Sequence, residues 1–272
     1  MAVAATPHAR QNRVYASEST SSNVIDRWIY VFMAVLFIAI TFTGFVPDSL
    51  GKIAAVEAGE RPPFPLVLHL HSILMGSFLL LLLAQTTLAA TGRLKYHQRL
   101  GVATVMLAPV LVVVGFVLIP TMYHQIWNGM QTAPPEVQVG MQELLSLFNN
   151  IMLVQIRIGI LFPLFLLIAV MARKNDSGLH KRMMFLAIAP ALPAAFDRIT
   201  WIPHTLPDSP LSPDLYVLLA LSPMVIWDLV HTRKVHKAYW IWLAFMAPTS
   251  ILIHSLWDTS WWQATAPRLV GL

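Results

Sequence analysis

Residues 65–120 read PLVLHLHSILMGSFLLLLLAQTTLAATGRLKYHQRLGVATVMLAPVLVVVGFVLIP. Two apolar runs flank a short turn that contains Arg93, Lys95, His97 and Arg99. At about 1.5 Å per helical residue, each run is long enough to cross about 30 Å of hydrocarbon. The stretch therefore predicts a transmembrane helical hairpin.

The composition extends this interpretation to the whole chain of 272 residues. Hydrophobic residues make up 57% of the sequence and charged residues 11%, whereas about a quarter of the residues in soluble domains are charged. We expect one transmembrane domain over residues 23–258 and an extracytoplasmic C-terminal tail over residues 259–272. Residues 1–22 are polar and lack the apolar core of a signal peptide, which predicts a disordered cytoplasmic tail.

The apolar runs predict an all-α integral membrane bundle of seven transmembrane helices. Their expected ranges are 28–45, 65–90, 100–119, 150–172, 183–202, 215–230 and 238–257. Two prolines, Pro190 and Pro193, are expected to kink the fifth helix. Residues 120–149 are too polar to span, so we expect a loop there with a short surface helix over residues 136–147.

The net charge of +5 resides largely in three turns, which follow the second, fourth and sixth expected helices. By the positive-inside rule these turns and the N-terminus are cytoplasmic, and the C-terminus is outside. The lipid bilayer is thus the expected partner of the cations, and no motif indicates nucleic acid. Because the chain has no cysteine, disulfides, thiolate metal sites, iron–sulfur clusters and c-type haem are excluded.

The three basic turns share a form: RLKYHQRLG at 93–101, SGLHKRMM at 177–184 and RKVHKAYW at 233–240. In each, a histidine stands at the start of the following helix, which suggests repeated helical hairpins. One interpretation is that these histidines and cations only anchor the helices at the membrane surface. The alternative is a metal or haem site on the cytoplasmic side, formed by the residues His97, His180, His236, His231 and Asp228.

Further ionisable residues lie toward the outer side, where burial in apolar helices is costly unless they face the bundle interior. His254 and Asp258 are four residues apart, so the carboxylate is able to orient the imidazole. We expect a transition metal, either Fe, Cu or Zn, or a haem b between His71 and His254, with His69 and Asp258 as further candidate metal ligands. His69 and His71 point in different directions on a helix.

Two arginines are candidates to supply charge to this outer cofactor site, Arg157 and Arg198. The competing structural interpretation is a buried salt bridge between Arg157 and Asp197 that contributes only to helix packing.

The segments HLHSILMGSFLLLLLAQTTLAATGRLKYHQRLGV, LHKRMMFLAIAPALPAAFDRITW and DLVHTRKVHKAYWIW resemble a family of bacterial polytopic membrane proteins whose function is not established. The resemblance covers residues 65–245 and implies a multi-pass protein of the bacterial inner membrane. It marks, by position, the residues His71, Gln85, His97, His180, Arg198, Asp228 and His236. The end of the last helix, HSLWDTSWW, departs from the family pattern, so the resemblance does not extend to His254 and Asp258.

Ten histidines without a cysteine favour a membrane redox or electron-transfer protein that binds haem b or a metal ion. Two alternatives stay open at this point. One is a metal-dependent membrane hydrolase, and the other is a transporter, a sensor or an accessory subunit without a cofactor. Other membrane subunits or a second copy of the chain are possible partners of any of these.

Overall fold

The computed structural model describes the backbone of residues 7–272 and the side chains from residue 26 onward. This part of the chain consists of helices joined by turns and loops, without a strand. The tail predicted for residues 1–22 lies outside the residues whose side chains are described, and it stays a prediction.

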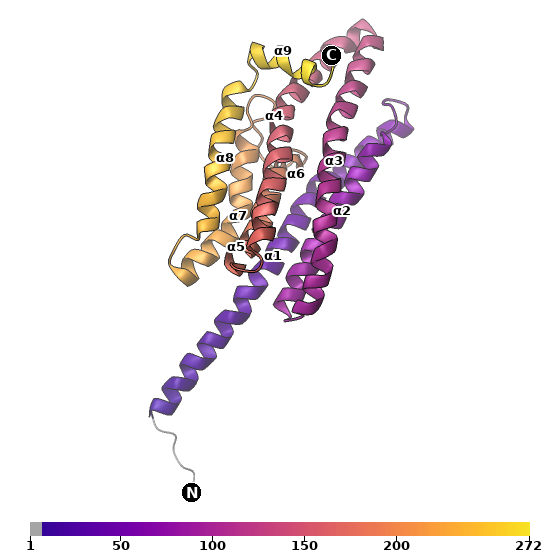
Figure 1. The fold of residues 1–272 in the computed structure, drawn as a ribbon. Helices are drawn as coiled ribbons and strands as arrows, with labels where there is room; N and C mark the ends of the chain where they lie inside the picture. Colours follow the sequence, from indigo (N-terminus) through magenta and orange to yellow (C-terminus); the bar gives the residue numbers. More distant parts are fainter. Residues whose placement is uncertain (1–6) are drawn as a thin grey trace.

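Helices follow one another along the whole described chain (Figure 1). They are α1 (Pro7–Glu57), α2 (Leu66–Ala90), α3 (Leu94–Thr132), α4 (Pro135–Ala172), α5 (Ser177–Ile188), the 3₁₀ turn η1 (Ala189–Ala191), α6 (Pro193–Phe196), α7 (Leu211–Thr232), α8 (Lys237–Leu256) and α9 (Ser260–Leu269).

Six of these helices are long and apolar enough to cross a membrane: α2, α3, α4, α7, α8 and the part of α1 from Asp26 to Glu57. The chain is therefore an all-helical, multi-pass membrane protein. The predicted second helix, 65–90, agrees closely with α2, whereas the predicted fifth helix is interrupted. It consists of α5, η1 and α6, and the interruption falls at Pro190 and Pro193, as expected from the missing backbone donors of proline.

The interrupted segment α5–η1–α6 occupies the centre of the bundle and contacts α1, α4, α7 and α8. Nearly every residue from Arg182 to Phe196 is buried or partly buried. The helix α1 approaches its backbone directly at Gly44, where an added Cβ would lie 2.2 Å from the carbonyl oxygen of Ala195. Only glycine permits this approach. The hairpin α2–α3 packs on one side of this centre, against α1 and α4.

Both α3 and α4 are longer than the sequence predicted. With 39 and 38 residues, each measures nearly 60 Å at about 1.5 Å per residue, well beyond the hydrocarbon thickness. The expected loop with a separate surface helix over residues 136–147 is therefore wrong, because this segment is the first part of α4. The additional turns of α3 and α4 pack into an apolar cluster that is separate from the main core of the bundle. This cluster includes Tyr123, Leu145, Met152 and Trp262.

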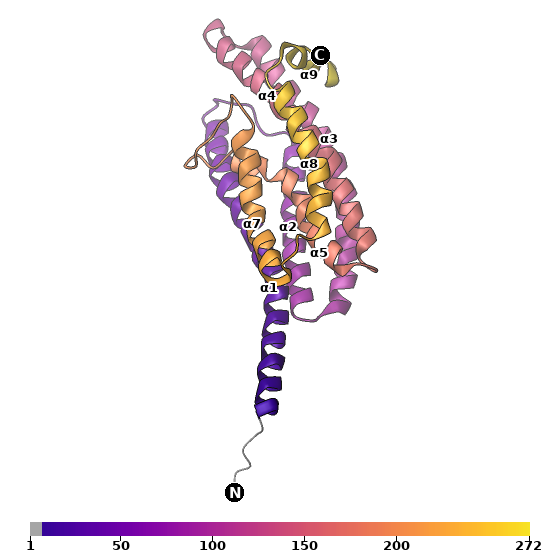
Figure 2. The ribbon, with the colours of Figure 1, turned by 90° about the vertical axis from the view of Figure 1, so that its left-hand side faces the viewer.

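The helix α9 lies against the upper part of α4, at the end of the bundle opposite to the start of α1 (Figures 1 and 2). The indole of Trp262 donates to the carbonyl oxygen of Asn149 at 2.7 Å. The side chain of Gln263 accepts from Asn149 at 2.7 Å and donates to Asn150 at 3.0 Å. The C-terminal residues 260–269 are therefore fixed to α4 by hydrogen bonds as well as by apolar contacts.

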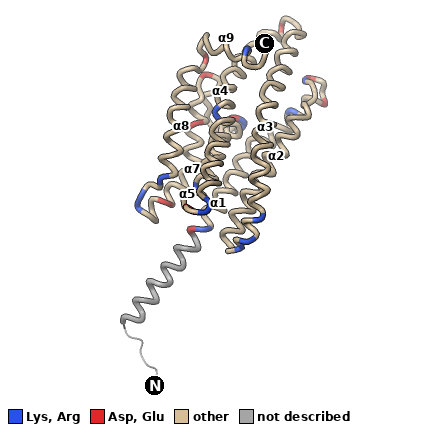
Figure 3. Tube along the Cα trace, in the orientation of Figure 1, with Lys and Arg blue, Asp and Glu red and all other residues tan. Residues whose placement is uncertain are grey.

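Lysine and arginine residues gather at the other end of the bundle, where α2, α4 and α7 end and α3, α5 and α8 begin (Figure 3). We call this end the basic end and the opposite one, where α9 lies, the α9 end.

Candidate histidine and ion-pair sites

Two of the predicted site residues, His97 and His180, come together at the basic end. His97 lies in the first turn of α3 and His180 in the first turn of α5. Their ring centroids are 6.4 Å apart, and the ring planes are nearly perpendicular, at 84°. Both rings are partly buried. The two hairpins α2–α3 and α4–α5 thus bring one imidazole each to a common position.

The two imidazoles are held in the same way. Nδ1 of His97 lies 3.1 Å from the carbonyl oxygen of Gln85, and Nδ1 of His180 lies 2.8 Å from that of Ala169. Each carbonyl belongs to the helix that precedes the histidine. If Nδ1 carries the proton and donates it to the carbonyl, Nε2 retains its lone pair, which is the arrangement typical of metal-binding histidines.

Polar side chains continue from His97 along the seam between α2 and α3. An added Cβ at Gly101 would lie 3.3 Å from Nε2 of Gln85, so the Gln85 side chain contacts α3 one turn after His97. Oε1 of Gln85 and Oγ1 of Thr104 are both buried without a hydrogen-bond partner. Buried polar atoms are normally paired, so this seam has capacity to bind a further polar group.

A buried ion pair lies near the histidine pair at the basic end. The guanidinium of Arg182 in α5 donates to both oxygens of Asp228 in α7, at 2.6 and 2.5 Å. Arg182 also donates to the carbonyl oxygen of Gly178 at 2.9 Å, and the hydroxyl of Tyr239 in α8 donates to Asp228. We call Arg182, Asp228 and Tyr239 the inner ion-pair cluster. Its members satisfy one another and join three helices.

The other histidines of the basic turns have separate contacts. The ring of His231 stacks on that of Trp227, with centroids 3.9 Å apart. His236 caps α8, and its Nδ1 accepts from the backbone of Ala238 at 3.1 Å. Burial lowers the pKa of His236, and the nearby positive charge of Arg182 lowers it further. The third basic turn thus lacks the carbonyl anchor that the first two share, and His231, His236 and Asp228 do not join the histidine pair.

A second ion pair lies toward the α9 end. Arg157 in α4 donates to Asp214 in the first turn of α7 at 2.8 Å, and to the hydroxyl of Ser250 in α8 at 2.8 Å. Nε2 of His254 lies 3.5 Å from Asp214. We call Arg157, Asp214, Ser250 and His254 the outer cluster. Arg157 is buried, and its Nε atom has no hydrogen-bond partner.

The predicted salt bridge between Arg157 and Asp197 is wrong, because Asp214 occupies the position next to the Arg157 guanidinium. Asp197 lies 3.8 Å from its neighbour Arg198 instead. Arg198 binds Asp48 of α1 at 3.2 Å and covers the ring of Phe45. Arg198 therefore joins α1 to the end of α6, and it is not part of the outer cluster.

The other outer site candidates are placed on separate surfaces. His69 is exposed, whereas His71 is partly buried and faces α3 at Gly115. His254 faces α7, so His71 and His254 do not face each other. Asp258 lies near Gln263, at 3.4 Å, and His254 has Asp214 as its acidic neighbour. Within residues 26–272, the four candidate metal ligands do not form a group that would hold a metal ion.

Sequence reasoning missed Asp214 and Tyr239. Asp214 ends the proline-rich segment PHTLPDSPLSPD, and that segment indicates a loop, so the carboxylate gives no signal of a buried partner. Tyr239 belongs to an aromatic run at the start of a membrane helix, where tyrosine commonly lies at the lipid interface. For Asp214 the sequence offered a signal only in its position, because it is an acidic residue in the first turn of an apolar helix.

Neither protein-family models nor characterised proteins nor solved structures give a match to this chain. The fold and the sites therefore define a class and no more: a helical multi-pass membrane protein. Within residues 26–272 it has a histidine pair at the basic end and one buried ion pair toward each end.

Proposed function

We propose that this protein is a membrane redox protein that binds haem b or a transition-metal ion through His97 and His180. The observation that carries the proposal is the shared anchoring of the two rings: each Nδ1 contacts a backbone carbonyl of the preceding helix, at 3.1 and 2.8 Å. This contact fixes the tautomer and leaves Nε2 for coordination.

The distance between the rings supports one shared metal atom. Metal–nitrogen bonds of about 2.0–2.1 Å place the centroid of a bound imidazole roughly 3 Å from the metal, so two opposed imidazoles lie roughly 6 Å apart. The observed separation of 6.4 Å falls in this range. A haem would need only two ligands from the chain, which His97 and His180 would supply, whereas a bare ion would need further ligands.

The unpartnered oxygens of Gln85 and Thr104 fit a polar group bound beside His97. A haem, or an iron or copper ion, held in this position would supply one-electron chemistry. The chain's own part is to orient the two rings, to keep Nε2 unprotonated and to hold them inside the bundle.

The topology that we propose has seven membrane crossings, with α5–η1–α6 as the fifth. The helix α4 ends at the basic end and α7 begins at the α9 end, so the chain crosses once between them (Figure 1). The positive-inside rule then places the basic end, the histidine pair and the N-terminus in the cytoplasm and α9 outside. In a bacterium this is the inner membrane.

The outer cluster supports a second candidate function, a transporter or sensor without a cofactor. Three helices meet at Arg157, Asp214 and Ser250, and ionisable groups at such positions commonly mark ion or substrate pathways. Asp214 and His254 keep side-chain exposures of 16% and 34%, which gives a polar ligand access to them. The hydrolase alternative gains no comparable observation, since a hydrolytic metal needs several protein ligands.

The test is an absorption spectrum of the detergent-purified protein, oxidised and reduced with dithionite, with metal analysis of the same sample. We expect either a Soret band with sharp reduced α and β bands, or one equivalent of iron or copper. In the variants His97→Ala and His180→Ala we expect loss of the bound group. His231→Ala is the matched control, because His231 is exposed at the same end and lies against Trp227.

Protein that carries neither haem nor stoichiometric metal would overturn the redox proposal and leave the transporter or sensor ahead. Retention of the full cofactor by both histidine variants would overturn the ligand assignment. Unfolding temperatures of all three variants, measured in the same detergent, distinguish loss of a ligand from loss of the fold.

A further inference from the structure

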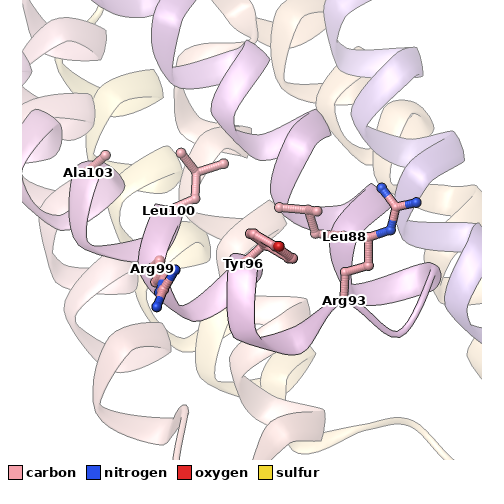
Figure 4. Close-up of a pocket in the computed structure, with 6 residues that line it drawn as sticks. All are labelled: Leu88, Arg93, Tyr96, Arg99, Leu100 and Ala103. Atoms are coloured by element: carbon pink, nitrogen blue, oxygen red, sulfur yellow. The ribbon is translucent and has the colours of Figure 1, made fainter.

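A groove of about 780 Å³ lies on the surface of the α2–α3 hairpin at the basic end. Its lining consists of Leu88, Arg93, Tyr96, Arg99, Leu100 and Ala103. Figure 4 shows Tyr96 between Arg99 on one side and Leu88 with Arg93 on the other, and Leu100 and Ala103 farther along α3. The groove therefore combines two guanidinium groups and a phenol with an apolar wall.

Among residues 26–272 the arginines of this groove have no acidic partner. Arg93 and Arg99 are exposed, and neither forms an ion pair with a carboxylate of residues 26–272. In the other basic turns some cations are paired, since Lys237 binds Asp176 at 2.6 Å and Arg182 binds Asp228, whereas Arg173 and Lys174 form no ion pair within residues 26–272. Two unpaired guanidinium groups at one groove are suited to an anion such as a phosphate.

The apolar wall continues from the groove along α3 toward the α9 end. Residues at helical spacing of three and four lie on the same face. They are Ala103, Met106, Val110, Val113 and Val117, and all five are exposed. The stripe rises about 21 Å along the helix axis from Ala103 to Val117, which is more than the roughly 15 Å of hydrocarbon in one leaflet. In a membrane this stripe faces lipid tails.

We propose that the groove is a binding site for an anionic phospholipid of the cytoplasmic leaflet. The phosphate binds at the groove to the arginines that flank Tyr96, Arg93 on one side and Arg99 on the other, and an acyl chain follows the apolar stripe of α3. The groove is positively charged, lies at the basic end and opens to the surface, which favours an anionic lipid. A soluble anion would make no contact with the apolar stripe. This site lies apart from Gln85 and His97 and is independent of any cofactor.

The experiment is native mass spectrometry of the detergent-solubilised full chain with added dioleoylphosphatidylglycerol or dioleoylphosphatidylcholine. We expect preferential retention of the anionic lipid. In the double variant Arg93→Gln/Arg99→Gln we expect its affinity to fall about thirtyfold, since a basic residue near an anionic surface contributes about 1 kcal/mol. The matched control is Arg173→Gln/Lys174→Gln, which removes the same charge from the next basic turn.

Equal retention of the two lipids, or an equal loss in the control variant, would show general attraction to basic turns and would overturn the proposal. The variant Ala103→Trp tests the groove itself without changing its charge. Ala103 is exposed, so the fold tolerates the larger ring, and we expect weaker binding of the anionic lipid. Unchanged binding in Ala103→Trp would place the lipid elsewhere. Binding of phosphate alone that matches the lipid would instead indicate a soluble anion and also overturn the proposal.

Discussion

The protein contains two buried arginine–aspartate pairs that differ in how completely they are closed. In the inner ion-pair cluster, the side chains of Arg182 and Asp228 are 8% and 4% exposed, and Tyr239 completes the hydrogen bonds of the carboxylate. In the outer cluster, Arg157 is 2% exposed but Asp214 is 16% exposed. Both side chains of the inner pair are buried, whereas in the outer pair the aspartate is more exposed than the arginine.

This difference in exposure indicates that the inner pair has a structural role, whereas the outer pair is accessible to other groups. A buried pair whose members satisfy each other has no hydrogen-bond donor or acceptor left for another group. The inner ion-pair cluster therefore serves to hold α5 against α7 and α8. In the outer cluster Nε of Arg157 stays unpartnered, and Asp214 faces both Arg157 and His254. Similar charges in the same bundle are thus expected to respond very differently to substitution.

The largest effect is expected from Asp228→Ala. The substitution leaves the charge of Arg182 buried without compensation, which typically costs about 3–5 kcal/mol. Unfolding by denaturant in detergent, compared with wild type, measures the loss. The partly exposed pair Lys52–Asp48 provides the control, and Lys52→Ala is expected to cost about 0–1 kcal/mol. A loss in Asp228→Ala as small as that of the control would refute the structural role.

A smaller loss is expected from Asp214→Ala, about 2 kcal/mol. This value lies between those of buried and exposed pairs, because the Asp214 side chain is 16% exposed and Ser250 still accepts from Arg157. The same denaturant assay applies. Losses of equal size in Asp214→Ala and Asp228→Ala would show that the outer cluster is as closed as the inner one.

A still smaller loss is expected from His254→Ala. The contact of His254 with Asp214 is long, at 3.5 Å, and the imidazole is one-third exposed. Exposed pairs of this kind contribute about 0–1 kcal/mol. If His254→Ala destabilises the protein more than Asp214→Ala does, His254 has a packing role that its exposure does not indicate.

The last prediction concerns the pH dependence of stability that arises from His236 at the basic end. The pKa of His236 is lowered by burial and by Arg182, with Asp228, Asp176 and Lys237 also nearby. The folded state therefore binds this proton less readily than the unfolded state, whose histidine pKa is about 6.5. Stability is fully present above that pH and falls as the pH decreases below it.

The measurement is the unfolding midpoint of wild type and of His236→Gln at pH 8 and at pH 5.5. We expect wild type to lose more stability than the variant on acidification. The same change in both proteins would assign the pH dependence to other groups.

The apolar pattern predicted seven spans, and six helices of the described chain are long and apolar enough to cross a membrane. It placed a helix at residues 65–90, close to the observed Leu66–Ala90, and the prolines at 190 and 193 marked the interruption of the fifth helix. It failed beyond the membrane, because the polar extensions of α3 and α4 are helical only through contacts such as that of Trp262 with Asn149. Those contacts depend on residues far apart in the sequence.

The sites were predicted less well than the fold. The shared form of the three basic turns suggested, as one of two interpretations, a joint site of His97, His180, His236, His231 and Asp228. The structure brings only His97 and His180 together, with ring centroids 6.4 Å apart. The partner of Arg157 was wrong, because the choice between Asp197 and Asp214 depends on how α6 ends and α7 begins. No local pattern reports that geometry. The predictions of a haem or metal ligand and of a redox function stay predictions.

The central position of α5–η1–α6 has a consequence for the biogenesis of the protein. This segment is short, interrupted by two prolines and charged at Lys181 and Arg182, so it is not among the spans that are apolar enough to cross alone. Free in lipid, its charges and its unpaired backbone groups would be costly. We therefore expect it to enter the membrane late, after α1 and α4 have inserted and only when Asp228 of α7 is available to Arg182. Assembly of the bundle is then completed around this short, interrupted segment.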